Sequence, residues 1–372
     1  MNTVFWEGLF IVLIASHVLS QQLIWTTIYP VEQGLHSNAV TALYQDRDAR
    51  LWVGTAAGDV AIVDGNSWKI IFESKYHTEY ISKIISDKKG AVWSINGPNL
   101  WRYANDIWTR YGGAVGHGVG KVATRASGSD CWDRQIIGVD PEVFDGIPYI
   151  PGDPVDIEFD EEGILWVVSE SESMVFSFDG AQISCWDEFS TEKVLYHNPV
   201  QVLPLARGRV LAIEISSFPP PIWLYDRDQW SLLPETPPSI GTKLVSNSVG
   251  ELFGGGRDGL FRFAAERWDQ IAVWSTDEVA SCSAIALDDS GGIWAIIQRP
   301  DHTASLFYCQ KDQVSQVSYP HNRTKEDQTS VDLLIVTPEQ KLIIGDREGL
   351  HIQSKSPTSV KTQSWGAVKT TR

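Results

Sequence analysis

The 372-residue sequence is poor in positive charge and in methionine, and it has no second long apolar run after its N-terminus. Lys and Arg number 30 against 47 Asp and Glu, which gives a formal net charge of −17. Because no Lys/Arg-rich stripe offsets this field, the composition argues against a nucleic-acid partner. Only two Met, and no long segments rich in Ala, Glu, Lys and Leu, argue against a helical protein.

Motifs for metal binding and nucleophilic catalysis are also missing. None of the eight His residues pairs with another His, a Cys or a carboxylate at metal-ligand spacing, and no G-x-S-x-G occurs. The sequence therefore predicts no cofactor and no metal, with calcium as the one alternative. Calcium prefers oxygen ligands, and "GDPVDIEFDEEG" (152–163) concentrates six acids. The competing interpretation is a hairpin turn whose acids, Asp160, Glu161 and Glu162, are simply solvated.

The abundant residue types are tryptophan, with 16 copies, and glycine, with 30. Aromatic residues favour strands and glycine favours tight turns, so the composition predicts many short strands. Four cysteines are present, Cys131, Cys185, Cys282 and Cys309, and they fall in strands that the repeat described below does not place side by side. A disulfide tolerates at most about 7 Å between Cα atoms, so we expect four free thiols and no disulfide.

The N-terminus carries an apolar run from Leu9 to Ser20 of the length of a signal-peptide core. Val18 and Ser20 are small enough for a cleavage site, which predicts a signal peptide over residues 1–20 and a mature domain over 21–372. An uncleaved anchor and a buried first strand are the alternatives, since no Lys or Arg precedes the run. We expect an extracytoplasmic (secreted or periplasmic) protein that is free of the membrane after cleavage. Asn322, in "NRT", is a formal glycosylation acceptor if the source is eukaryotic.

A hairpin recurs along the chain. "LHSNAVTALYQDRDARLWVGTAAG" (35–58) holds an apolar strand, an Asp-bearing turn and a second strand, and similar segments follow at steps of 34–49 residues. The second strand of each copy is marked by Trp52, Trp93, Trp132, Trp166, Leu211, Phe253, Trp294 and Ile343. A second half-motif such as "VDGNSW" or "YDRDQW" follows most copies and adds another hairpin.

Four strands in about 40 residues, repeated, are typical of a β-propeller, because one such sheet cannot bury both faces alone. The fold prediction is all-β: a single propeller of four-stranded blades, most simply eight. Seven blades, with residues 110–153 as an insertion, is the alternative. "LIWTTIY" (23–29) precedes the first copy, and we expect it to complete the last blade and close the ring.

The first repeat resembles the two-component regulator propeller repeat, whose pattern is G-L-x-[SP]-N-x-V followed by D-x-x-G-x-L-W-[VI]-G-T. The matching residues are Gly34, Leu35, Ser37, Asn38, Val40, Asp46, Leu51, Trp52, Val53, Gly54 and Thr55, while Ala49 replaces a glycine. The resemblance implies a propeller of the kind found as the extracytoplasmic sensor part of bacterial two-component regulators. It also implies that signalling output is not in this chain, which has no kinase segment.

One column of the repeat points to a ligand site. Directly before an all-apolar position of the first strand stand five polar residues: Lys83, Lys121, Asp156, Gln201 and Lys243. Strand alternation turns this column away from the apolar one, either to an axial channel or to the next blade, where burying lysines would be costly. The channel alternative predicts an anion-binding funnel for an acidic or carbohydrate ligand, or a solvated lining without one.

Three functions remain in competition on the sequence alone. The leading hypothesis is a monomeric binding or sensing propeller, whose partner is a small acidic or carbohydrate ligand or a protein. The alternative is a propeller enzyme, a lyase or glycan-active enzyme with a site at the channel mouth. No nucleophile–base or carboxylate pair stands at matching positions of adjacent repeats, which favours binding. Two carboxylates or a His/Glu cluster within hydrogen-bond reach would favour the enzyme, and an exposed apolar face would favour a scaffold.

Overall fold

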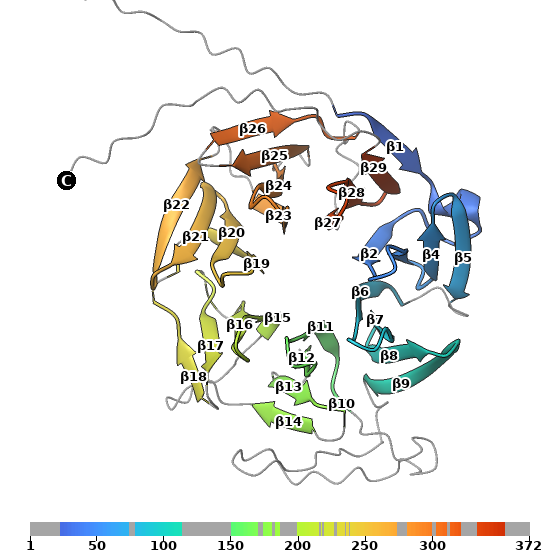
Figure 1. Ribbon diagram of the computed structural model, residues 1–372, viewed down its shortest axis with the longest axis horizontal. Coiled ribbons are helices and arrows are strands. Elements are labelled where there is room, and N and C mark those ends of the chain that lie inside the picture. The colour runs from blue at the N-terminus through green and yellow to red at the C-terminus, as the bar shows by residue number, and fades with distance from the viewer. Residues whose placement is uncertain are drawn as a thin grey trace, which may run out of the picture.

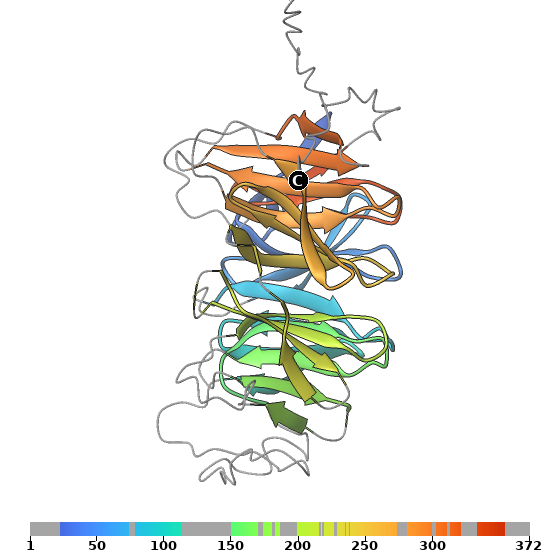
Figure 2. The same ribbon diagram turned by 90° about the vertical axis from the view of Figure 1, so that its left-hand side faces the viewer.

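A computed structural model of the chain describes residues 23–73, 79–113, 150–169, 174–180, 183–186, 199–215, 217, 219–226, 229–234, 236–237, 239–273, 281–299, 303–310, 313–320 and 333–353. Within these residues the chain is built almost wholly of short strands, arranged as a ring of blades around one axis (Figure 1). The view from the side shows a disc, in which strands of successive blades lie in layers (Figure 2).

The described strands form seven sheets, numbered here as blades in chain order. Blade 1 contains β2 (Val40–Gln45), β3 (Leu51–Thr55), β4 (Val60–Asp64) and β5 (Ser67–Phe72). Blade 2 contains β6 (Ile81–Ser86), β7 (Val92–Asn96), β8 (Asn99–Ala104), β9 (Ile107–Gly113) and the short β10 (Ile150–Pro151). Blade 3 contains β11 (Pro154–Phe159), β12 (Leu165–Ser169), β13 (Met174–Phe178) and β14 (Ile183–Trp186). In each, the first strand lies nearest the axis and each following strand of the meander lies farther out (Figure 1).

The same order repeats through the rest of the chain. Blade 4 contains β15 (Pro199–Pro204), β16 (Val210–Glu214), β17 (Ile222–Asp226) and β18 (Gln229–Leu232), and blade 5 contains β19 (Ile240–Ser246), β20 (Leu252–Gly256), β21 (Gly259–Ala264) and β22 (Arg267–Val273). Blade 6 contains β23 (Ser281–Leu287), β24 (Ile293–Gln298), β25 (Ala304–Gln310) and β26 (Gln313–Val317). Blade 7 contains β27 (Leu333–Val336), β28 (Leu342–Gly345) and β29 (Leu350–Gln353), joined by β1 (Trp25–Ile28).

The N-terminal strand closes the ring, as the sequence predicts. β1 pairs antiparallel with β29, from Trp25 opposite Gln353 to Ile28 opposite Leu350. The short 3₁₀ helix η1 (Pro30–Gln33) then leads into blade 1. Blade 7 is therefore made of both ends of the described chain, so that the ring cannot open without breaking this sheet.

The prediction of eight blades is wrong, and the seven-blade alternative is confirmed within the described residues. Neighbouring inner strands contact each other all round the ring, including β6 with β11, so no blade stands between the second and the third. The repeat copy at Trp132 belongs to residues 114–149, which lie outside the described residues.

A hydrogen-bonded aspartate closes the turn of the first hairpin in blades 1 to 3. Asp46 accepts hydrogen bonds from the backbone N–H groups of Asp48 and Arg50 and from the Trp52 indole, at 2.8–3.0 Å. Asp87 and Asp160 do the same six residues before Trp93 and Trp166. Blade 4 has Leu205 at the same place, six residues before Leu211, and forms its hairpin without this side-chain acceptor. The bonds to Asp160 also give that residue of the acid-rich segment a turn-forming role.

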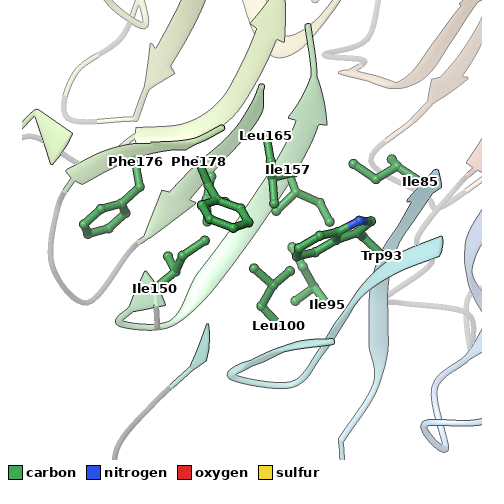
Figure 3. Packing of buried hydrophobic residues seen from close by; sticks show 10 residues of the cluster. Ile85, Trp93, Ile95, Leu100, Ile150, Ile157, Leu165, Phe176 and Phe178 are labelled. Atoms are coloured by element: carbon green, nitrogen blue, oxygen red, sulfur yellow. The ribbon is translucent and has the colours of Figure 1, made fainter. Parts of the chain in front are cut away.

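The hydrophobic core lies between blades. Where blade 2 meets blade 3, Trp93 and Ile95 pack against Ile157 and Leu165, and Phe176 and Phe178 extend the cluster outward (Figure 3). Blades approach closely because small residues stand at their faces. A Cβ on Gly54 would lie 2.5 Å from Cγ2 of Ile81, so a larger side chain there would push the first two blades apart. This close packing fixes the inner strands relative to one another.

Two of the four cysteines are described as free thiols, Cys282 and Cys309. Cys282 lies on β23 opposite Ile297 and Cys309 lies on β25 opposite Ile293, with β24 between them, as expected. Cys131 and the side chain of Cys185 are outside the described part, as are the apolar N-terminal run and Asn322. Among the described residues, no helix is long and apolar enough to cross a membrane.

Candidate functional site

The inner strands carry a recurring irregularity just where the polar column begins. In blades 1 to 6 the register between the first and second strands shifts near the start of the inner strand, for example between Ile81 and Lys83 and between Pro154 and Asp156. A bulge of this kind inserts one residue and re-aims the side chain that follows it. In blades 2, 3 and 4 that following residue is Lys83, Asp156 or Gln201.

These side chains reach toward the next blade. The apolar neighbour Ile157 packs backward onto Trp93 and Ile95 of blade 2, and strand alternation turns Asp156 the opposite way. The Asp156 Oδ2 atom accepts a hydrogen bond from the backbone N–H of Val202 at 2.9 Å. Gln201 repeats the pattern one blade further, where its amide bonds both the N–H and the carbonyl of Leu244. Two of the five predicted site residues therefore brace neighbouring inner strands.

Lys83 is held between two carboxylates of blade 3. Its Nζ lies 3.0 Å from Asp156 Oδ1 and 2.6 Å from Glu158 Oε1. Lys83 and Glu158 keep 29% and 32% of their side-chain surface exposed, whereas Asp156 keeps 10%. The three residues, called here the inner-strand cluster, thus combine a buried carboxylate with an ammonium and a second carboxylate that solvent can reach.

Burial and neighbouring charges both shift the pKa values of Lys83 and Glu158. Burial of the Lys83 ammonium opposes its protonation, but the charges of Asp156 and Glu158 outweigh burial and raise the pKa of Lys83. Burial also raises the pKa of Glu158; the Lys83 ammonium lowers it, and the neighbouring Asp156 carboxylate raises it again. The single ammonium is therefore well compensated, while the carboxylate of Glu158 keeps a raised pKa despite its contact with Lys83.

The three predicted lysines are not brought together in the described structure. Lys243 lies on β19 with an exposed side chain, and Lys121 is outside the described residues. The remaining lysine, Lys83, is already paired with two carboxylates. These two carboxylates already neutralise its positive charge, so an anion would gain little by binding to it.

Glu158 is the site residue that sequence reasoning missed, although a signal was present. The corresponding position two residues after the polar column is occupied in the six other blades by Tyr44, Ile85, Leu203, Val245, Ala286 and Ile335. Glu158 is the one charged residue in that column of described strands. A position where one repeat breaks an otherwise apolar pattern is a better indicator of function than a position that is merely polar.

A second titratable cluster lies beside the first hairpin of blade 1. His36 Nδ1 is 3.2 Å from Asp59 Oδ1, and its backbone N–H donates to Asp59 Oδ2 at 2.7 Å. His36 Nε2 lies 3.4 Å from Glu73 Oε1. Asp59 is fully buried, while His36 is about one-third exposed. No group of three or more His, Cys, Asp or Glu in the described part of the chain is arranged to hold a metal ion.

Comparison with known proteins confirms the repeat. Residues 34–57 match the family model "Two component regulator propeller". A comparison with curated protein sequences gives no significant match.

Several solved structures share the fold at low identity. The extracellular domain assigned to a hybrid two component system from B. thetaiotaomicron has a TM-score of 0.62 and 11% identity, over 90% of this chain and 40% of that one. Virginiamycin B lyase from Staphylococcus aureus has a TM-score of 0.61 and 9% identity, over 89% and 98%. YCF48 from Cyanidioschyzon merolae has a TM-score of 0.57 and 12% identity, over 88% and 98%. The chain spans about two fifths of the two-component-system chain.

Proposed function

We propose that the protein is an extracytoplasmic ligand-binding propeller of the sensor type, and that it binds a small polar ligand at the inner-strand cluster. The observation that carries this proposal is the break in repeat symmetry at Glu158. Six blades place an apolar or aromatic residue there, and blade 3 places a carboxylate that shares the Lys83 ammonium.

Structural needs do not explain that carboxylate. The junction between blades 4 and 5 is braced by the neutral amide of Gln201, without any ion pair in the same position. At the junction between blades 2 and 3, Asp156 alone would pair with Lys83. Glu158 adds an exposed acceptor that the fold does not require, which is typical of a residue kept for binding.

The ligand class follows from the groups on offer. Lys83 donates hydrogen bonds, while Glu158 accepts them, so a ligand with several hydroxyl groups would satisfy both. Of the ligands that the sequence suggests, a carbohydrate therefore fits better than an acidic molecule, whose charge would have to compete with Asp156 and Glu158 for the ammonium. The extracytoplasmic location is supported by the apolar run at Leu9–Ser20 and by the extracellular relatives.

A glycan array tests this proposal. Wild-type protein is compared with Glu158→Gln, which removes one charge at nearly constant shape, and with Glu266→Gln, the same change in an exposed turn between β21 and β22. We expect at least one glycan class to bind, with a loss of about tenfold or more in Glu158→Gln and none in Glu266→Gln. Binding that is equal in all three proteins, or no binding, would overturn it.

The second candidate is a propeller enzyme, and two observations favour it. Two carboxylates contact one ammonium in the inner-strand cluster, and His36 is oriented by the buried Asp59. A histidine held by a carboxylate on one nitrogen is suited to proton transfer through the other, which in His36 lies 3.4 Å from the exposed Glu73 Oε1. The lyase fold relatives agree with this candidate in fold only.

A product assay separates the two candidates. Polysaccharides and cyclic peptide lactones are incubated with wild type, with Glu158→Gln and with His36→Gln, and products are followed by mass spectrometry. Turnover that one of these substitutions abolishes would establish the enzyme. Binding without turnover in the wild type would leave the sensor proposal in place.

A further inference from the structure

The inner-strand cluster has an excess of negative charge. One ammonium, on Lys83, faces two carboxylates, so the cluster carries a net charge of −1 when all three groups are ionised. The whole chain adds to this field with its formal net charge of −17. The potential at the cluster therefore attracts cations and repels anions, and low-dielectric surroundings strengthen both effects.

Glu158 is the more exposed of the two carboxylates in the cluster. Both oxygens of Asp156 are occupied, Oδ1 by Lys83 and Oδ2 by the Val202 N–H, and the Asp156 side chain is only 10% exposed. Glu158 contacts Lys83 through Oε1, and about a third of its side chain is exposed. A ligand would therefore meet the carboxylate of Glu158 before that of Asp156.

From this charge and this exposed carboxylate we infer that the ligand carries a protonated amine, as an amino sugar does, and that the amine binds the carboxylate of Glu158. The inference rests on the proposed function, because it names the ligand of the same site. An ammonium needs only one or two acceptors with hydroxyl contacts beside it. A hard metal ion needs about six oxygen ligands, and the cluster does not supply them.

Binding of an amine would place a second positive charge beside Glu158, whose pKa is raised. The charged groups that face Glu158 are Lys83 from β6 and Asp156 from its own strand. A ligand ammonium favours the ionised carboxylate, so its affinity rises as the pH rises through the elevated pKa of Glu158. At lower pH the ligand must displace a proton, and its binding is weaker.

Chitosan oligosaccharides and their N-acetylated counterparts give a matched pair of probes, since they share one sugar backbone and differ in the acetyl group that makes each nitrogen neutral. Oligogalacturonate serves as the acidic probe. Affinities for all three probes are measured by isothermal titration calorimetry at pH 6. We expect the deacetylated sugar to bind at least tenfold more tightly than the acetylated one, and oligogalacturonate to bind least.

Two substitutions sharpen the test. Glu158→Gln is expected to lower the affinity for the deacetylated sugar about tenfold or more. Lys83→Met removes the cation that competes with the ligand, so it is expected to raise that affinity, whereas an anion site would lose its ligand altogether. Circular dichroism and thermal melting establish that each variant remains folded, and Lys69→Met, on the exposed edge strand β5, is the control for loss of a positive charge.

The outcomes separate the inference from the function on which it rests. Preferential binding of the acetylated or acidic sugar, with sensitivity to Glu158→Gln or Lys83→Met, would overturn the amine while leaving a ligand site in the inner-strand cluster. Binding of any probe that neither variant changes would overturn the site itself. Loss of amine binding in Lys83→Met, with the fold intact, would also contradict the inference.

Discussion

The Asp156 carboxylate accepts a hydrogen bond of 2.9 Å from the backbone N–H of Val202, so that a side chain of blade 3 holds the inner strand of blade 4. Its other oxygen binds Lys83 of blade 2. One buried carboxylate therefore connects three blades at the axis. Asp156 therefore contributes both to the stability of the ring and to the proposed ligand site.

Replacing Asp156 should destabilise the ring. In Asp156→Ala the Val202 N–H and the Lys83 ammonium both lose a partner, and we expect a loss of about 2–4 kcal/mol in the free energy of unfolding. Asp156→Asn keeps an acceptor for Val202 and should lose about half as much. Urea denaturation measures both values. Equal stability of wild type and Asp156→Ala would show that the contact contributes nothing.

The turn aspartates should tolerate asparagine better than alanine. Asn247 occupies the equivalent turn of blade 5 and bonds the N–H groups of Val249 and Glu251, as Asp46 bonds its own turn. Asp46→Ala should therefore cost about 2–3 kcal/mol, with Asp46→Asn well below that. Asp48→Asn, on the exposed side of the same turn, is the control and should change stability by less than about 0.5 kcal/mol. Thermal melts that rank the three otherwise would contradict the prediction.

Glu158 should make stability depend on pH. Its pKa is higher in the folded protein than in the unfolded chain, so the unfolded chain releases its proton first as the pH rises. The favourable contribution is complete below the ordinary Glu pKa of about 4.3 and is lost as the pH rises through the folded pKa. Wild type should therefore lose stability relative to Glu158→Gln as the pH rises above about 4.3 and through the raised folded pKa. A difference between the two proteins that stays constant across this range would exclude the raised pKa.

The closing blade depends on a buried histidine. His351 Nε2 lies 3.0 Å from Asp346 Oδ1, and Nδ1 lies 3.0 Å from the Thr27 hydroxyl of β1. His351→Leu should cost about 3 kcal/mol, because it leaves the buried Asp346 without this partner. Thr27→Val should cost about 1 kcal/mol. Urea titration gives both values, and limited proteolysis should cut the N-terminal strand faster in His351→Leu. An unchanged cleavage rate would show that the histidine does not hold β1.

The sequence predicts the blades better than it predicts their number. Asp46, Trp52 and their counterparts lie close together in the chain, so the hairpins they form can be recognised locally. The copy at Trp132 shares the apolar and aromatic pattern, and its lack of the turn aspartate is shared by blade 4, which has Leu205 there. Local pattern therefore could not decide between seven and eight blades, because the number of blades follows from which inner strands pack against each other.

For the candidate site, sequence reasoning found the strand positions of Lys83 and Asp156 but missed the charge partner Glu158. Alternation correctly turns Lys83 and Asp156 away from the apolar column, and both lie on inner strands. Which groups would neutralise Lys83 depends on how two blades pack, and the partner Glu158 is far away in sequence. Charge partners across a blade junction follow from tertiary packing, so local pattern could identify the column but could not identify the ion pair.

A crystal structure of the protein with a chitosan oligosaccharide tests the central claim most directly. The account predicts electron density for the sugar at the inner strands β6 and β11, with an amine nitrogen about 2.8–3.0 Å from a carboxylate oxygen of Glu158. Density for the sugar at the His36 cluster or on the outer strands, with the Lys83, Asp156 and Glu158 side chains unoccupied, would contradict it.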